Sequence, residues 1–154
     1  LRARGVSQKE REEPSLHYIK EVGLLGFEDK YPHQLSGGMR QRTGLARALT
    51  VNSDILLMDE PFSAVDEQMR RKLQEDLLNL LKIESKTVIF VTHSIEEAVY
   101  LADQVVILSG RPGSIADIVY PEIDRQGEID LIRRQPRYME LVDEIWSSLK
   151  RYVE

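Results

Sequence analysis

Ser36, Gly37 and Gly38 have the residue types and order of a turn that can hold an anion. Neither glycine carries a Cβ, and the residues from Met39 onward have a helical pattern. The backbone at such a turn can approach an anion closely, and the N–H groups at the start of a helix favour negative charge. The sequence therefore predicts a phosphate-binding turn, with Ser36 as the N-cap of the following helix.

Two adjacent carboxylates, Asp59 and Glu60, follow the short apolar run from Ile55 to Met58. A run of this length fits a buried parallel strand, and open α/β sheets bind ligands at the carboxyl ends of their strands. Pro61 disfavours the right-handed helical conformation for the residue before it, so we expect Glu60 to be extended. The pattern predicts a carboxylate base held in a fixed direction.

A histidine and a further aspartate complete the candidate residues. His93 follows the β-branched run from Thr87 to Thr92, which predicts the next parallel strand. The carboxyl ends of parallel strands meet at one edge, so His93 should lie at the same edge as Glu60. This position favours a functional histidine over one at a strand end whose hydrogen bonds are merely structural. Asp66 is predicted to cap a long helix, which gives it a structural role in any case.

The elements that position these residues alternate between helices and strands. Helical spacing and capping residues predict helices at about 14–22, 37–50, 67–83, 95–102 and 137–152, and strands at 55–59, 87–92, 104–108 and 115–120, with turns at 52–54 and 110–114. Ser94 and Glu97 have capping-box spacing at the start of the helix at 95–102. Ser7 and Glu10 have it too, but Pro14 limits how far one helix can run. The last strand is expected to be antiparallel, and residues 121–130 to form a polar linker.

Two helices have a clear apolar face. The helix at 37–50 should bury Leu45, Ala48 and Leu49. The last helix carries its apolar residues on one face, namely Leu141, Ile145, Trp146, Leu149 and Tyr152. This pattern favours a helix docked on the core over a regulatory or partner-binding helix.

Composition excludes several classes of protein. The 154 residues suit one domain, and the net charge of −5, with both signs spread along the chain, gives no footprint for nucleic acid or an anionic membrane. The absence of cysteine excludes a disulfide framework or a thiolate metal site. No apolar run approaches the ~20 residues that span a bilayer. Because the sequence opens on Leu1 rather than Met, we expect it to be a fragment.

Four motifs in order, LSGGMRQR at 35–42, ILLMDEP at 55–61, SAVD at 63–66 and His93 after VIFVT, resemble the ATP-binding cassette (ABC) ATPases. The details MRQR, EEAVYLAD, SGRPG and DEIW resemble the importer ATPases for nitrate, sulfonate and taurine. The resemblance covers nearly the whole chain. It implies the C-terminal portion of an α/β P-loop NTPase (RecA-like) domain, a mostly parallel sheet flanked by helices that lacks its N-terminal Walker A part.

The resemblance also implies a division of the chain and a set of site residues. Residues 1–52 would be the remnant of a helical subdomain with the signature helix, 53–120 part of the catalytic core, and 121–154 a linker and C-terminal helix. With ATP and Mg²⁺ as the implied cofactors, the implied catalytic residues are Glu60 and His93, the implied metal residue is Asp59, and the implied nucleotide-binding residues are Ser36, Gly37, Gly38 and Asp66. The residues at 36–38 would contact a nucleotide held by a second ATPase subunit.

The phosphate-binding motif G-x-x-x-x-G-K-[ST] does not occur in this sequence. By the family pattern, the strand that leads into this motif would lie between the strands at 87–92 and 104–108. The fragment alone should therefore lack a strand in the middle of its sheet and be marginally stable. It should also be inactive. The full-length protein would be a transporter ATPase at the cytoplasmic face of the membrane. It would work with a paired ATPase subunit, transmembrane permease subunits and, indirectly, a solute-binding protein. A soluble ABC-superfamily ATPase and a catalytically silent interaction module remain alternatives.

Overall fold

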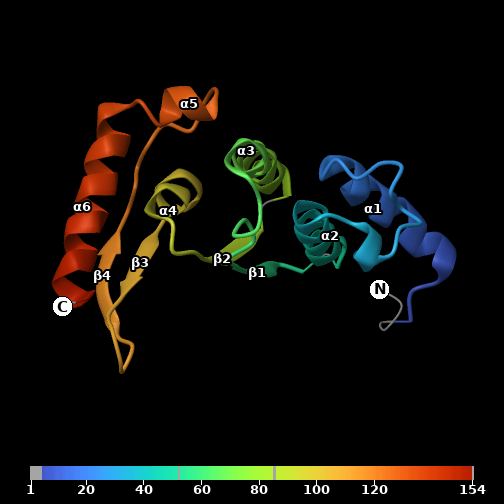
Figure 1. The fold of residues 1–154 in the computed structure, drawn as a ribbon, viewed down its shortest axis with the longest axis horizontal. Helices are drawn as coiled ribbons and strands as arrows, with labels where there is room; N and C mark the ends of the chain where they lie inside the picture. The colour runs from blue at the N-terminus through green and yellow to red at the C-terminus, as the bar shows by residue number, and fades with distance from the viewer. Residues whose placement is uncertain (1–4, 52, 85, 154) are drawn as a thin grey trace. The chain divides into compact units, whose positions relative to one another are not determined.

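The computed structural model describes residues 5–51, 53–84 and 86–153. The chain forms two compact units, Leu1–Val91 (unit 1) and Thr92–Glu154 (unit 2) (Figure 1). Asn52, the first residue of the turn predicted at 52–54, lies outside the described residues. No helix in the described part of the chain is both long enough and apolar enough to cross a bilayer.

Helix α1 (Gln8–Glu21) opens unit 1 and begins six residues earlier than the predicted 14–22. Its start is set by the capping box: the Glu10 N–H donates to Ser7 Oγ at 3.4 Å, and the Ser7 N–H donates to Glu10 Oε2 at 3.2 Å. Pro14 lies inside the helix and costs it one backbone hydrogen bond without ending it. The helix ends where Gly23 adopts φ +68° and donates its N–H to Lys20 O at 2.9 Å.

Helix α2 (Gly37–Thr50) has the predicted bounds and follows a short 3₁₀ helix, η2 (Pro32–Gln34). It packs against α1 through a cluster of Val22, Leu24 and Ala46. Arg42 adds a polar contact, donating from Nη1 to the carbonyls of Val22 at 3.3 Å and Gly23 at 3.4 Å. Leu49 is buried as predicted, but Leu45 and Ala48 are only half-buried, because the side of α2 that faces α1 is centred on Ala46.

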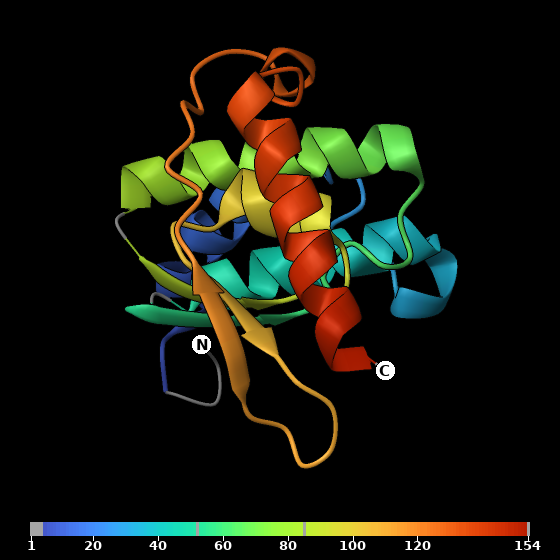
Figure 2. The ribbon, with the colours of Figure 1, turned by 90° about the vertical axis from the view of Figure 1, so that its left-hand side faces the viewer.

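Strands β1 (Ile55–Asp59) and β2 (Thr87–Val91) form a parallel pair, joined by helix α3 (Glu67–Glu84). Figures 1 and 2 show α3 running over one face of this sheet. Leu56 and Met58 are buried, whereas Leu57 is 73% exposed and Ile89 54% exposed. The sequence predicted that β1 would be buried. This is wrong for the face that carries Leu57, since side chains alternate between the two faces of a strand.

Unit 2 contains helix α4 (Ile95–Leu101), the antiparallel strands β3 (Val105–Leu108) and β4 (Ile115–Val119), and helices α5 (Ile129–Ile132) and α6 (Pro136–Val153). In the part of the chain that the structure describes, the strands form two two-stranded sheets, β1 with β2 in unit 1 and β3 with β4 in unit 2. Helix α5 falls partly within the predicted polar linker. It forms there because Ile129 and Ile132 are both buried.

Helix α6 docks on α4 and β4, as predicted for a helix that covers core surface. Its buried residues recur at helical spacing and are Tyr138, Leu141, Ile145 and Ser148. The Tyr138 hydroxyl donates to the Glu96 carbonyl at 2.9 Å, and burial raises the pKa of Tyr138 to about 12. Trp146, predicted on the buried face, is 53% exposed instead, with the Lys150 ammonium 5.3 Å from its ring centre. The buried face of α6 is rotated from the predicted one, because Tyr138 and Ser148 make polar contacts on the side that packs against α4 and β4.

Candidate functional site

The turn at Ser36 has the predicted capping geometry. Ser36 Oγ accepts the Met39 N–H at 3.2 Å, and the Ser36 carbonyl accepts the Arg40 N–H at 2.9 Å. Gly37 and Gly38 form the first turn of α2, whose leading N–H groups have no acceptor within a helix. Ser36 is exposed, so this helix start can present N–H groups to an anion.

The start of α2 lies directly against the loop from Glu60 to Asp66. A Cβ on Gly37 would lie 3.7 Å from the Ala64 carbonyl, and a Cβ on Gly38 would lie 3.9 Å from Val65 Cγ1. Both would be ordinary contacts, so the glycines bring two backbones close without being sterically required there. The structure therefore brings the predicted phosphate turn and the acidic loop together within unit 1.

Glu60 has φ +43° and is one of two described non-glycine residues with positive φ. The expected extended conformation is wrong. The Glu60 N–H continues the β ladder by donating to Val91 O at 2.8 Å, while the Glu60 carbonyl accepts the Ser63 N–H at 3.2 Å. To make both of these hydrogen bonds, the backbone reverses direction at Glu60. Non-glycine residues seldom adopt positive φ, and such strain is retained where surrounding bonds fix it.

Ser63 supports this turn with its side chain as well as its backbone. The Ser63 hydroxyl donates to the Glu60 carbonyl at 3.0 Å and accepts a long bond from Gln41 Nε2 at 3.4 Å. Pro61 stands at the second position of the four-residue turn, a position that proline favours. A chain of hydrogen bonds thus runs from α2 to the backbone of Glu60.

Asp59 and Glu60 are both exposed at the carboxyl end of β1, and Asp59 is in register with Val91. Within the ranges that the structure describes, no three His, Cys, Asp or Glu residues are grouped as a set of metal ligands. One or two carboxylates fit Mg²⁺, which keeps several waters and takes further oxygens from substrate phosphates. The donor set at Asp59 therefore suits a magnesium ion that is shared with a phosphate ligand.

Asp66 caps helix α3, as predicted. Its Oδ1 accepts the Met69 N–H at 3.0 Å, and its carbonyl accepts the Arg70 N–H at 2.8 Å. Arg70 also donates from Nη2 to the Val65 carbonyl at 3.0 Å. These bonds fix the end of the loop that starts at Glu60. Asp66 is exposed, so its carboxylate remains at the surface of unit 1.

His93 belongs to unit 2, where it precedes α4 and is exposed. Its neighbours in the chain are both engaged: the Thr92 hydroxyl donates to Glu97 Oε2 at 2.6 Å, and Ser94 Oγ accepts the Glu97 N–H at 3.3 Å. Ser94 is thus the predicted N-cap of α4. That His93 shares a site with Glu60 stays a prediction.

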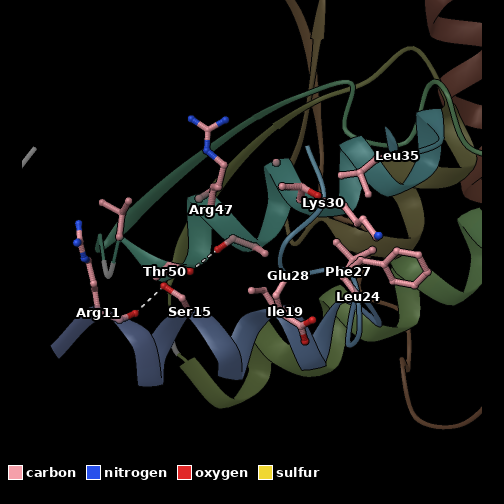
Figure 3. Close-up of a pocket in the computed structure, with 15 residues that line it drawn as sticks. Arg11, Ser15, Ile19, Leu24, Phe27, Glu28, Lys30, Leu35, Arg47 and Thr50 are labelled. Atoms are coloured by element: carbon pink, nitrogen blue, oxygen red, sulfur yellow. Dashed lines mark hydrogen bonds between the residues drawn. The ribbon is translucent and has the colours of Figure 1, made fainter. Parts of the chain in front are cut away.

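A pocket of about 790 Å³ lies elsewhere in unit 1, between α1, the loop at 23–35 and α2. Figure 3 shows Ile19, Leu24 and Leu35 among its lining, and the charged residues Arg11 and Arg47 come from the two helices. None of the site residues predicted from the sequence lines this pocket. The predicted site is instead an exposed surface formed by a helix start and a loop, which fits a ligand shared with another surface.

The sequence interpretation missed Gln41, Ser63 and Thr92 as supporting residues. Two of them have a local signal in the sequence: Ser63 lies two residues after Pro61 in a turn, and Thr92 and Ser94 place hydroxyls on both sides of His93. Hydroxyl side chains near turns and helix starts commonly bond to nearby backbone. Their acceptors and donors depend on the fold, so residue type alone does not identify them.

Residues 2–63 match the family model described as ABC transporter. The chain is 44% identical to a taurine import ATP-binding protein of Rhizobium johnstonii and 39% identical to a nitrate import ATP-binding protein of Synechocystis, each over 97% of this chain and 58% of the relative. It is 50% identical to a glycine betaine transport ATP-binding protein of Bacillus subtilis, over 79% of this chain and 29% of the relative. The chain thus spans somewhat more than half the length of the first two relatives.

The structure is also similar to an ATP-binding cassette that was solved as a dimer in a post-hydrolysis state with ADP and Pi bound. The TM-score is 0.65 at 32% identity, and the match covers 79% of this chain and 50% of the solved chain. The predicted fold class is therefore confirmed: the chain has part of the α/β P-loop NTPase fold of the ABC ATPases, with a small parallel sheet flanked by helices.

Proposed function

Because the chain corresponds to part of an ABC transporter ATPase domain, we propose that its parent protein is the ATP-hydrolysing subunit of an importer. This chain supplies the water-activating side of the ATP site and the surface that meets a partner's nucleotide. The chain has no G-x-x-x-x-G-K-[ST] motif, so the fragment by itself neither binds ATP with useful affinity nor hydrolyses it.

The solute is of the nitrate, sulfonate or taurine type. The extent of the alignments supports this choice, because the taurine and nitrate import relatives align over 97% of the chain. The glycine betaine relative is more identical but aligns over only 79%. The similarity to the first two therefore covers more of the chain.

Glu60 is the general base that takes a proton from the attacking water, and His93 holds the γ-phosphate and helps orient that water. Asp59 would help to hold Mg²⁺, which would neutralise charge on the phosphates. Ser36, Gly37 and Gly38 bind the γ-phosphate of a nucleotide on a second ATPase subunit. Asp66 links the two ATP sites of the dimer. It ends the loop that starts at Glu60, and other residues of that loop lie beside the Ser36 turn.

The observation that carries this proposal is the fixed, left-handed Glu60. Its N–H is bonded to Val91 O and its carbonyl to the Ser63 N–H and hydroxyl, while its side chain is exposed at the strand end. Such a constrained backbone limits the directions in which the Glu60 carboxylate can point, which favours the fixed geometry that general-base catalysis requires. A purely structural acid at a strand end has no need of this geometry.

The wider assembly follows from the same proposal. The subunit works as a homodimer or beside a paired ATPase subunit, at the cytoplasmic face of the membrane, against transmembrane permease subunits that receive solute from a binding protein. Within the chain, residues 1–52 belong to the helical subdomain, 53–120 to the catalytic core, and 121–154 to a linker and C-terminal helix.

Replacing each of the two acids by its amide in the full-length subunit tests these roles. Glu60→Gln should lower the hydrolysis rate by about 10²- to 10⁴-fold, the range for a lost general base, while ATP binding survives and an ATP-bound dimer accumulates on size exclusion. Asp59→Asn should weaken MgATP binding and dimer closure as well as hydrolysis. If Glu60→Gln kept near wild-type turnover while Asp59→Asn trapped the dimer, the two roles would have to be exchanged.

A further inference from the structure

His93 lies between two residues that are tied to one buried carboxylate. Glu97 is only 5% exposed, and its Oε2 accepts the Thr92 hydroxyl at 2.6 Å. The Ser94 N–H donates to Thr92 Oγ1 at 3.0 Å, and Ser94 Oγ accepts the Glu97 N–H at 3.3 Å. Three hydrogen bonds therefore close a ring around the single residue between Thr92 and Ser94.

The direction of each bond in this ring is fixed. A hydroxyl has one proton to donate, and the Ser94 N–H already uses Thr92 Oγ1 as an acceptor. The Thr92 proton therefore points at Glu97, whose oxygen must accept it. The 2.6 Å distance lies at the short end of the range for a hydroxyl donor, so this bond holds Thr92 closely against Glu97.

The ring is anchored to the rest of unit 2 through the residue next to Glu97. The Glu96 carbonyl accepts the hydroxyl of the buried Tyr138 at 2.9 Å, and the Glu96 carboxylate pairs with Arg133 at 3.1 Å. Helix α4 is thereby held against α6. The exposed His93 side chain thus extends from a backbone that is fixed on both sides.

We propose that Thr92 and Glu97 are positioning residues that hold His93 in the orientation needed for ATP hydrolysis. The proposal rests on the proposed role of His93. It goes beyond helix capping, because Ser94 Oγ alone supplies the cap of α4. A cap needs no buried carboxylate behind it, whereas a histidine that must meet a phosphate needs a fixed backbone.

Thr92→Val is the informative change, because valine keeps the shape of threonine and removes the hydroxyl. In the full-length subunit it should lower kcat by about 10- to 100-fold, the order expected for a small misplacement of a reacting group, with KM for ATP within about twofold of wild type. Thr92→Ser keeps the hydroxyl and should restore most of kcat. Glu97→Gln keeps an acceptor oxygen and should be intermediate between them.

Glu96→Gln is the matched control. It removes an acid from the neighbouring position of α4, and with it the ion pair to Arg133, but leaves Thr92 and its bonds in place. It should lower the melting temperature by less than Thr92→Val does, because the Glu96 carboxylate is half-exposed and Glu97 is buried, and kcat should stay near wild type. Equal losses of kcat in both variants would mean that helix stability, rather than the position of His93, controls turnover.

A double-mutant cycle with His93→Ala separates positioning from a merely structural role. If Thr92 acts through His93, adding Thr92→Val to His93→Ala should cause no further loss of kcat in single-turnover assays. Multiplicative losses would overturn the proposal. So would wild-type kcat in Thr92→Val and Glu97→Gln, although a strong loss in His93→Ala would then leave the proposed function standing. Full activity in His93→Ala would instead refute the role given to His93 itself.

Discussion

Replacing Ser63 by alanine tests whether the Glu60 backbone has to be held in its left-handed conformation. The change removes the hydroxyl that donates to the Glu60 carbonyl at 3.0 Å but keeps the Ser63 N–H bond to the same carbonyl at 3.2 Å. It adds no bulk and touches neither Asp59 nor the Glu60 side chain. An effect on turnover would therefore act through the Glu60 backbone or through the bond that the same hydroxyl accepts from Gln41, and the Gln41→Ala variant separates these two routes.

The expected magnitude follows from two opposing energies. A positive φ on a non-glycine residue costs about 1 to 3 kcal/mol, while a neutral hydrogen bond contributes about 0.5 to 1.5 kcal/mol net. Losing one of the bonds that hold Glu60 is therefore comparable with the strain they oppose. At about 1.4 kcal/mol for each tenfold change in rate, Ser63→Ala should lower kcat by about 2- to 12-fold.

The assay is steady-state ATP hydrolysis by the full-length subunit, with KM and kcat measured separately. KM should stay near wild type, since a base that acts on water contributes to the transition state rather than to ground-state binding. Ser63→Thr keeps the hydroxyl and should be close to wild type. Gln41→Ala removes only the long 3.4 Å bond to Ser63 and should have a smaller effect than Ser63→Ala.

The outcome that contradicts this reasoning is specific. If Ser63→Ala left kcat unchanged, the hydroxyl would have no part in holding Glu60, and the Val91 bond and the Ser63 N–H would suffice. If Gln41→Ala had the larger effect, the relevant contact would be the packing of α2 on the loop instead.

Three further changes test the partner surface and the docked helix. In the full-length subunit, Ser36→Arg should leave ATP binding by the monomer nearly unchanged but suppress ATP-dependent dimerisation and turnover, because bulk and charge at the exposed start of α2 block closure; normal dimerisation on size exclusion would remove this turn from the interface. Leu141→Ala should destabilise the protein by about 2 to 5 kcal/mol, because Leu141 is fully buried. Trp146→Ala, at a half-exposed position beside Lys150, should destabilise the protein less than Leu141→Ala does. Equal shifts of the two variants in chemical denaturation would contradict the burial pattern.

Local chemistry in the sequence determined most of the elements and the starts of α2, α3 and α4. Ser36, Asp66 and Ser94 were all predicted as N-caps, and each accepts an N–H three residues later. The bounds of α2 and β1 also agree with the prediction. These signals act over one turn of helix or one short strand, so they hold whatever the rest of the chain does. The family motifs are also short contiguous stretches, so the sequence alone was enough to indicate the family.

Only the tertiary structure decided how these pieces are oriented. Pro61 restricts Glu60 but does not choose its sign of φ; that depends on Val91 O, which lies on another strand, and on Ser63 across the turn. Periodicity in α6 predicted an apolar face, yet contacts with Glu96 and Asp117 turned Tyr138 and Ser148 inward and left Trp146 outside. Hydrogen-bond partners and packing surfaces that are distant in sequence make these choices, and a local pattern carries no information about which of them the fold brings near.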